Sequence, residues 1–223
     1  MPLTLLRALP WVLALAAAVA LAIAGRTRGP LWLHYLGKPA MLPILLAWTF
    51  SFPSALPDQA QPWLWAALAL AWVGDIALMF GRVGFLLGLA SFLLGHLAYL
   101  VCFSFEVPWR WPQLAYLAAV LPFAILAMRG VLPRVGRLKP PVLAYAIVLT
   151  GVAWRLVTRF DRVEQLGAAA WLLGAVGGGL FVLADSLLVR RRFAGAKVPY
   201  WLELGSYAAS QACIVASTLS LGR

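Results

Sequence analysis

Residues 63–80 read WLWAALALAWVGDIALMF, an apolar run of membrane-helix length that one carboxylate, Asp75, interrupts. A membrane helix needs about 20 mostly apolar residues to cross a hydrocarbon core of about 30 Å. An ionised carboxylate at that depth costs on the order of 3 kcal/mol even on lenient insertion scales. A second carboxylate, Asp185, lies in GGGLFVLADSLLV at 177–189. Because packing gives no reason to keep these charges, both aspartates indicate chemistry or ion transport.

The composition indicates an integral membrane protein. The chain is 64% hydrophobic and 11% charged, with a mean hydropathy of +0.90. A soluble domain of this length would need far more polar surface. We expect an all-α fold: a polytopic membrane helix bundle of about eight spans in a single domain, 1–223. The expected spans are 8–24, 39–52, 63–80, 84–105, 112–128, 140–157, 168–189 and 200–221.

The net charge of +11 is distributed over short loops, as expected for topology signals and lipid headgroups, and predicts no nucleic-acid partner. Twelve Lys and Arg residues fall on one side of the predicted membrane and six on the other. The positive-inside rule places the twelve in the cytoplasm and both termini outside. The high Ala, Leu and Arg content suggests a bacterial protein, so we expect the membrane to be a bacterial inner membrane. Three of the six, Arg155, Arg159 and Arg162, lie against this trend in the loop after the sixth span. The apolar run after Arg7 resembles a signal peptide, but its length predicts a retained first helix.

Polar residues from five predicted helices share the cytoplasmic leaflet. Asp75 and Asp185 each lie about 8 Å or less from the cytoplasmic end of a span, at 1.5 Å per residue. The other members are Lys38 at the opening of the second span, His96 and Tyr99 deeper in the fourth, and Glu203, Tyr207 and Gln211 in the eighth. Their convergence predicts a cavity open to the cytoplasmic side.

Most of these residues also have a purely structural interpretation. Lys38 could be an anchor that extends to the interface, and His96 a hydrogen-bonded core residue. Gln211 could bridge helices, and we expect Glu203 to be solvated. The two cysteines, Cys102 and Cys213, lack a C-x-x-C neighbour and are expected to be buried thiols. For the two aspartates the structural interpretation is the weaker one.

At these positions the chain resembles the YhhN-like membrane proteins, the lysoplasmalogenase family. The similar pieces are LGKPAMLPIL (36–45), WVGDIALMF (72–80), GLASFLLGHLAYLVCF (88–103), GGGLFVLADSLL (177–188) and SYAASQACI (206–214). The family usually has Ser before the second aspartate, where this chain has Ala184. The resemblance implies an eight-helix membrane hydrolase that cleaves the vinyl ether bond of lysoplasmalogens, releasing a fatty aldehyde and a glycerophospho-base.

The chemistry of a vinyl ether suits two carboxyl groups. Protonation of its β-carbon gives an oxocarbenium ion, to which water adds, as in glycoside hydrolysis. One carboxyl group would act as the acid and the other as base and cation stabiliser, and we predict that Asp75 and Asp185 are this pair. The predicted positioning residues for water and glycerol are His96, Tyr99, Tyr207 and Gln211, with Lys38 at the phosphate. No metal or other cofactor is expected.

Two other classes of function stay open. Intramembrane Asp, His and Lys residues also occur in proton-coupled transporters, although no inverted repeat is visible here. A non-catalytic lipid-binding protein could use the same cavity. The expected partners are a lysophospholipid substrate and membrane lipids, and the sequence leaves the oligomeric state open.

Overall fold

The computed structural model describes residues 3–220, and every regular element in this part of the chain is a helix. The extended pairing found there is one isolated bridge between Ser54 and Leu219. The predicted all-α fold class is therefore confirmed for the described residues. The end of the expected span 200–221 and Arg223 of the charge count lie outside them.

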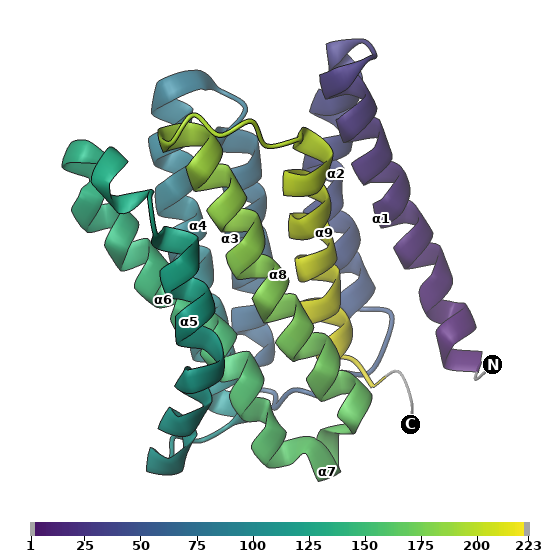
Figure 1. Ribbon diagram of the computed structural model, residues 1–223. Coiled ribbons are helices and arrows are strands. Elements are labelled where there is room, and N and C mark those ends of the chain that lie inside the picture. Colours follow the sequence, from purple (N-terminus) through teal and green to yellow (C-terminus); the bar gives the residue numbers. More distant parts are fainter. Residues whose placement is uncertain (1–2, 221–223) are drawn as a thin grey trace. The chain divides into compact units, whose positions relative to one another are not determined.

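The chain divides into two compact units, and the boundary falls within α4. The first unit is Met1–Cys102 with Thr218–Arg223, and the second is Phe103–Ser217. The first contains α1 (Leu3–Thr27), α2 (Leu31–Thr49), α3 (Gln61–Ala77) and most of α4 (Gly81–Glu106) (Figure 1). The second contains η1 (Trp111–Tyr116), α5 (Leu117–Met128), η2 (Leu132–Arg134), η3 (Gly136–Leu138), α6 (Lys139–Thr158), η4 (Arg159–Arg162), α7 (Val163–Leu166), α8 (Ala168–Phe193) and α9 (Tyr200–Ser217).

Several of these helices have the length and composition of membrane spans. Among the described residues, five stretches qualify: Leu6–Thr27, Val83–Glu106, Trp111–Arg134, Gly136–Leu166 and Ala168–Phe193. Helix α3 has 17 residues and is therefore about 26 Å long, slightly less than a hydrocarbon core. Helices α2 and α9 carry charged and polar side chains that lower their hydropathy. The long apolar helices indicate a multi-pass membrane protein.

Helix α2 starts at Leu31, well before the expected 39, and continues through Pro39 and Pro43. Pro43 has no N–H group, so the Pro39 carbonyl oxygen lacks its usual helical donor. The indole nitrogen of Trp72 in α3 donates to that oxygen at 2.8 Å. This bond satisfies a backbone group that has no water available in an apolar environment, and it joins α3 to α2.

Close approach of α3 and α4 depends on small residues. A Cβ atom added to Gly74 would lie 2.8 Å from the Phe92 ring, and one added to Gly95 would lie 3.3 Å from the Ala67 carbonyl oxygen. The hydroxyl of Ser91 in α4 donates to the Leu70 carbonyl oxygen in α3 at 2.6 Å. Gly74 directly precedes Asp75, so the packing that holds α4 also fixes the backbone of this aspartate.

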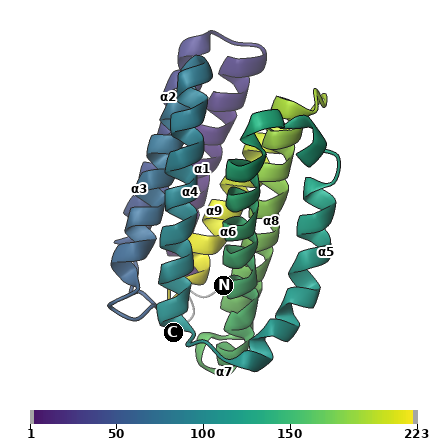
Figure 2. The ribbon, with the colours of Figure 1, turned by 90° about the vertical axis from the view of Figure 1, so that its left-hand side faces the viewer.

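In the second unit, α8 lies between α6 and α9 (Figure 1, Figure 2). A Cβ atom on Gly178 would meet Ala153 of α6 at 3.2 Å, and one on Gly177 would meet Ile214 of α9 at 2.9 Å. The hydroxyl of Ser210 donates to the Gly177 carbonyl oxygen at 2.8 Å. The glycine run of α8 therefore serves two interfaces at once.

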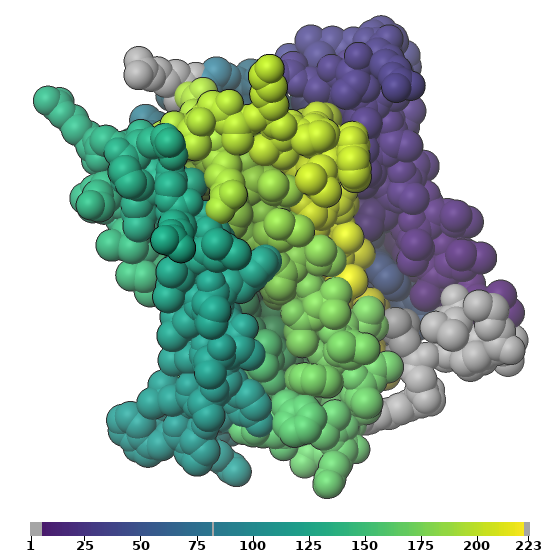
Figure 3. All heavy atoms as spheres, viewed as in Figure 1, coloured from purple at the N-terminus to yellow at the C-terminus, as the bar shows by residue number. Residues whose placement is uncertain are grey.

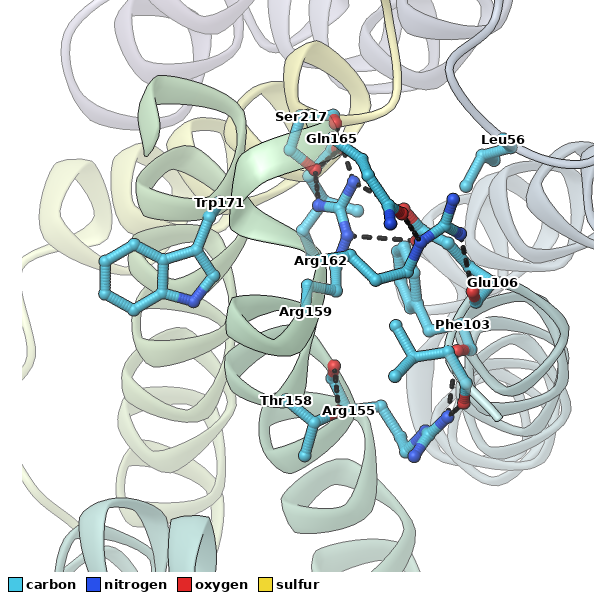
Figure 4. A network of polar contacts seen from close by, with 12 residues as sticks. Leu56, Phe103, Glu106, Arg155, Thr158, Arg159, Arg162, Gln165, Trp171 and Ser217 are labelled. Atoms are coloured by element: carbon cyan, nitrogen blue, oxygen red, sulfur yellow. Dashed lines mark hydrogen bonds and ion pairs between the residues drawn. The ribbon is translucent and has the colours of Figure 1, made fainter. Parts of the chain in front are cut away.

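A buried ionic network holds one end of the second unit together (Figure 4). The Arg159 guanidinium, which is fully buried, pairs with Glu106 at 2.9 Å (Nε to Oε2). It also donates at 2.8 Å to the carbonyl oxygen of Ser217, the last residue of α9. A cation at a helix C-terminus satisfies carbonyl groups that lack intrahelical donors and complements the helix dipole.

Arg155 acts in the same way on the end of α4. Its guanidinium donates to the carbonyl oxygens of Phe103 and Val107, and to the side chain of Gln113 at 3.2 Å. The assignment of Arg155, Arg159 and Arg162 to a topology loop is therefore wrong for the first two. Arg155 belongs to α6, Arg159 opens η4, and both are buried because each binds helix-terminal carbonyl groups.

Substitution of Glu106 by Gln should destabilise the protein strongly, because the buried Arg159 charge would lose its counter-charge. Removing one partner of a buried ion pair costs about 3–5 kcal/mol. Thermal unfolding of the purified protein in detergent measures the loss. Glu164→Gln, at an exposed position in α7, is the matched control. An unchanged melting temperature for Glu106→Gln would contradict the stabilising role of this pair.

Candidate functional site

Asp75 and Lys38 form a buried ion pair in the first unit. The Lys38 Nζ atom lies 3.3 Å from Oδ1 of Asp75 and 3.3 Å from its backbone carbonyl oxygen. Lys38 is 8% exposed and Asp75 is 2% exposed, so both charges are held away from solvent. An ammonium group at this distance compensates the charge of an ionised carboxylate in a low-dielectric environment.

The predicted positioning residues of α4 also lie in the first unit, and both are buried. His96 is in contact through Nδ1 with the Phe92 carbonyl oxygen one turn earlier, which orients the imidazole ring. Tyr99 lies three residues further along the same helix face. Gly88 of α4 lies beside Gly74 of α3, the residue before Asp75. Because His96 lies further along α4 than Gly88, it is deeper in the helix pair than Asp75. The structure leaves the roles of His96 and Tyr99 as predictions.

Asp185 lies in α8 of the second unit, where it accepts a hydrogen bond from Tyr145. The Tyr145 hydroxyl donates to Oδ2 of Asp185 at 2.6 Å, and both residues are buried. A distance of 2.6 Å is at the short end of the usual range for an O–H···O hydrogen bond. Tyr145 comes from α6, which packs along α8. The tyrosine therefore holds the Asp185 carboxylate in a defined orientation.

Sequence reasoning missed Tyr145, although a signal was present. The residue lies in PPVLAYAIVL, within two turns of the start of its span. That start is flanked by basic residues, as is the end of the span that holds Asp185. The other residues were grouped by their distance from the cytoplasmic end of each predicted span. The same criterion selects Tyr145.

Tyr207 and Gln211 occupy buried positions one turn apart on α9, as their spacing predicted. The Tyr207 ring lies against Phe181 of α8, with ring centroids 6.3 Å apart. The same stripe begins with Glu203. Its carboxylate pairs with Arg191 at 2.6 Å and 2.8 Å, and the residue is 9% exposed. The expectation of a solvated Glu203 is therefore wrong, because Arg191 at the end of α8 neutralises it.

The structure thus joins some of the predicted residues and leaves others apart. It brings Lys38 onto Asp75 within the first unit, whereas we predicted a phosphate contact for Lys38. It adds Tyr145 as a partner of Asp185 within the second unit. The two aspartates belong to different units, so their joint action is a hypothesis about chemistry.

Neither cysteine takes part in a disulfide. Cys102 is buried and Cys213 is partly buried. Within residues 3–220 there is no cluster of three or more His, Cys, Asp or Glu side chains suited to a metal ion.

The YhhN family model matches residues 33–218. The chain belongs to the YhhN family. The matched region runs from α2 to the end of α9 and contains Lys38, Asp75, Asp185 and the other predicted site residues. The resemblance of the sequence to YhhN proteins is thereby confirmed. No curated protein and no solved structure matches this YhhN protein.

Substitution of Lys38 by Met should destabilise the protein, because the buried Asp75 carboxylate would lose its ammonium partner. The expected cost is about 3–5 kcal/mol. Adding Asp75→Asn to Lys38→Met should recover part of this loss, since the remaining group is then neutral. Thermal unfolding of both variants in detergent measures the effect, with Lys197→Met at an exposed loop position as the control. A double variant that is less stable than Lys38→Met would contradict the pairing.

Proposed function

We propose that this YhhN protein is a membrane hydrolase that cleaves the vinyl ether bond of lysoplasmalogens. The products would be a fatty aldehyde and a glycerophosphoethanolamine or glycerophosphocholine. The observation that carries the proposal is the pair of buried carboxylates in apolar helices, each with a dedicated polar partner. Buried ionisable groups in a membrane protein are by default functional candidates. Membership of the YhhN family also supports the proposal.

The reaction needs one proton donor and one water-activating base. A carboxylic acid protonates the β-carbon of the vinyl ether, and the electron pair of the double bond forms the new C–H bond. The adjacent carbon becomes an oxocarbenium ion stabilised by a nearby carboxylate. Water adds to that carbon and gives its proton to the base. The resulting hemiacetal breaks its bond to the glycerol oxygen, which leaves as an alcohol, and an aldehyde remains.

We assign the ionised role to Asp75 and the proton-donor role to Asp185. The Lys38 ammonium compensates a negative charge on Asp75, which suits this group to stabilise a cation and to accept a proton from water. The Tyr145 hydroxyl orients Asp185 within its helix pair, and a positioned carboxyl group is what proton transfer to carbon requires. In this proposal Lys38 acts on Asp75, in addition to the predicted role at the substrate phosphate.

The remaining predicted residues keep their proposed roles. His96 and Tyr99 on α4, with Tyr207 and Gln211 on α9, would position water and the glycerol part of the substrate. The bundle would cross a bacterial inner membrane about eight times as a single membrane domain. The side with twelve Lys and Arg residues would face the cytoplasm. A substrate from the surrounding lipid would then reach the carboxylates without leaving the membrane.

The test is the identity of the products. Purified protein is incubated with a lysoplasmalogen and, in parallel, with an ordinary acyl lysophospholipid, and the products are analysed by mass spectrometry. Fatty aldehyde from the vinyl ether alone is the expected result. Fatty acid from the acyl lipid, or no product from either, would overturn the proposal. The absence of product together with proton-driven flux in liposomes would establish a transporter instead.

Asp75→Asn and Asp185→Asn should each lower aldehyde release by a factor of about 10² to 10⁴, the usual contribution of one acid or base group. Asp58→Asn, in an exposed loop, is the control and should keep full activity. Lower pH should partly restore Asp185→Asn, because hydronium ions can replace the missing acid in vinyl ether hydrolysis, whereas Asp75→Asn should not recover. Full activity in either single variant would contradict the paired-carboxylate mechanism.

A further inference from the structure

Two short segments at one end of the second unit carry most of the charge on the predicted cytoplasmic side. The first, residues 129–139, connects α5 to α6, and the second, residues 190–197, contains the last turn of α8 and the start of the loop to α9. Together they hold eight of the twelve Lys and Arg residues on that side, and neither segment contains Asp or Glu. We call residues 129–139 and 190–197 the basic surface.

Apolar contacts hold the two segments against each other. Val131, Val135 and Val142 form a small buried cluster, and Val189 and Phe193 of α8 pack against it. The segments lie next to each other near the top of Figure 3, residues 129–139 in teal-green and residues 190–197 in yellow-green. The two groups of cations are therefore brought together by the fold of the second unit, although they are far apart in the sequence.

The cations of the first segment are on its outer side. Val131 and Val135 are buried, whereas Arg134 and Arg137 between and after them are exposed. Arg129 and Lys139, which flank the 3-10 turns η2 and η3, are exposed as well. The loop from α5 to α6 is thus folded with its valines inward and its four cations outward.

Contacts within the protein explain only part of this charge. Arg191 pairs with Glu203 at 2.6 Å, and the Arg190 guanidinium donates to the Leu126 carbonyl oxygen of α5 at 2.9 Å. Cations in the last turn of α8 also complement the helix dipole. Lys139 has the opposite effect, because it lies in the first turn of α6, where a cation is unfavourable for the helix. Cations gathered on one surface repel each other, so this surface favours a negatively charged partner.

The basic surface lies at the depth of lipid headgroups. The stretches Trp111–Arg134, Gly136–Leu166 and Ala168–Phe193 are long and apolar enough to cross a membrane, and each has one end in this surface. Helix α8 has 26 residues and is therefore about 39 Å long, more than the hydrocarbon core of about 30 Å. Its basic last turn thus extends into the headgroup region. The anions at that depth are lipid phosphates, and anionic lipids of the cytoplasmic leaflet attract basic residues close to its surface.

We propose that the basic surface binds anionic phospholipids of the cytoplasmic leaflet, with the lipid phosphate held between residues 129–139 and residues 190–197. A lipid whose headgroup has a net negative charge binds in preference to a zwitterionic one. The positive-inside rule concerns only how many cations lie on each side of a membrane, whereas a lipid site requires them to be held together in the folded protein. This lipid is not the substrate of the proposed hydrolase, whose ethanolamine and choline headgroups are zwitterionic, and its binding does not depend on that reaction.

The test measures lipid binding to the full-length protein in detergent by native mass spectrometry, which gives a dissociation constant for each bound lipid. Phosphatidylglycerol should bind about tenfold more tightly than phosphatidylcholine with the same chains. Arg137→Gln combined with Lys139→Gln should remove most of this preference, because two exposed cations of the surface are lost. Arg26→Gln combined with Arg28→Gln makes the same change in net charge at exposed positions of the first unit, and should leave the preference within about twofold.

Three results would overturn the proposal. One is equal affinity of the unmodified protein for the two lipids, and another is an equal loss of preference in the two double variants. The third is competition by soluble glycerol phosphate as strong as that by the lipid, which would indicate a site for free phosphate. If Arg137→Gln with Lys139→Gln fails to fold, phosphatidylglycerol with a photoreactive headgroup should label residues 129–139 or 190–197 of the unmodified protein. Labelling confined to other segments would contradict the assignment, whether or not lysoplasmalogen yields aldehyde.

Discussion

The cost of burying a carboxylate among apolar helices constrains this structure more than any other interaction. An isolated buried charge is strongly unfavourable, so each buried acidic residue must be compensated by a partner from another helix or turn. The described part of the chain meets this requirement with four contacts: Asp75 with Lys38, Glu106 with Arg159, Asp185 with Tyr145, and Glu203 with Arg191. Each contact ties two elements together and so fixes their relative register.

These polar contacts divide into two kinds by their surroundings. Arg159 and Arg155 bind the terminal carbonyl groups of α9 and α4, so their network has a sufficient structural explanation. Lys38 also contacts a carbonyl oxygen near the end of α3, that of Asp75, whereas the Asp185–Tyr145 pair binds no helix end. Asp185 instead lines a cavity with apolar walls, and Asp75 follows a glycine packed against Phe92. This difference supports a functional role for Asp185 and a stabilising role for the arginine network.

Sequence reasoning recovered the helical fold and the family, and it located two carboxylates that are buried in apolar helices, because each has a local signature. Apolar runs of membrane length and a carboxylate within them can be read directly from one segment. It failed at Glu203, Arg155 and Arg159, whose burial depends on partners in other helices. It also missed Tyr145, since a tyrosine near the end of an apolar helix is common and only its partner makes it notable. The continuation of α2 through Pro39 likewise depends on a distant residue, Trp72.

The account depends on one chemical step, the protonation of a vinyl ether carbon by a buried carboxylic acid. The most direct measurement is hydrolysis of lysoplasmalogen by the purified protein in heavy water, with mass analysis of the released aldehyde. The account predicts one deuterium on the carbon next to the carbonyl group, above the level found when preformed aldehyde is incubated with the protein. Aldehyde without that deuterium would contradict it, as would the release of fatty acid instead.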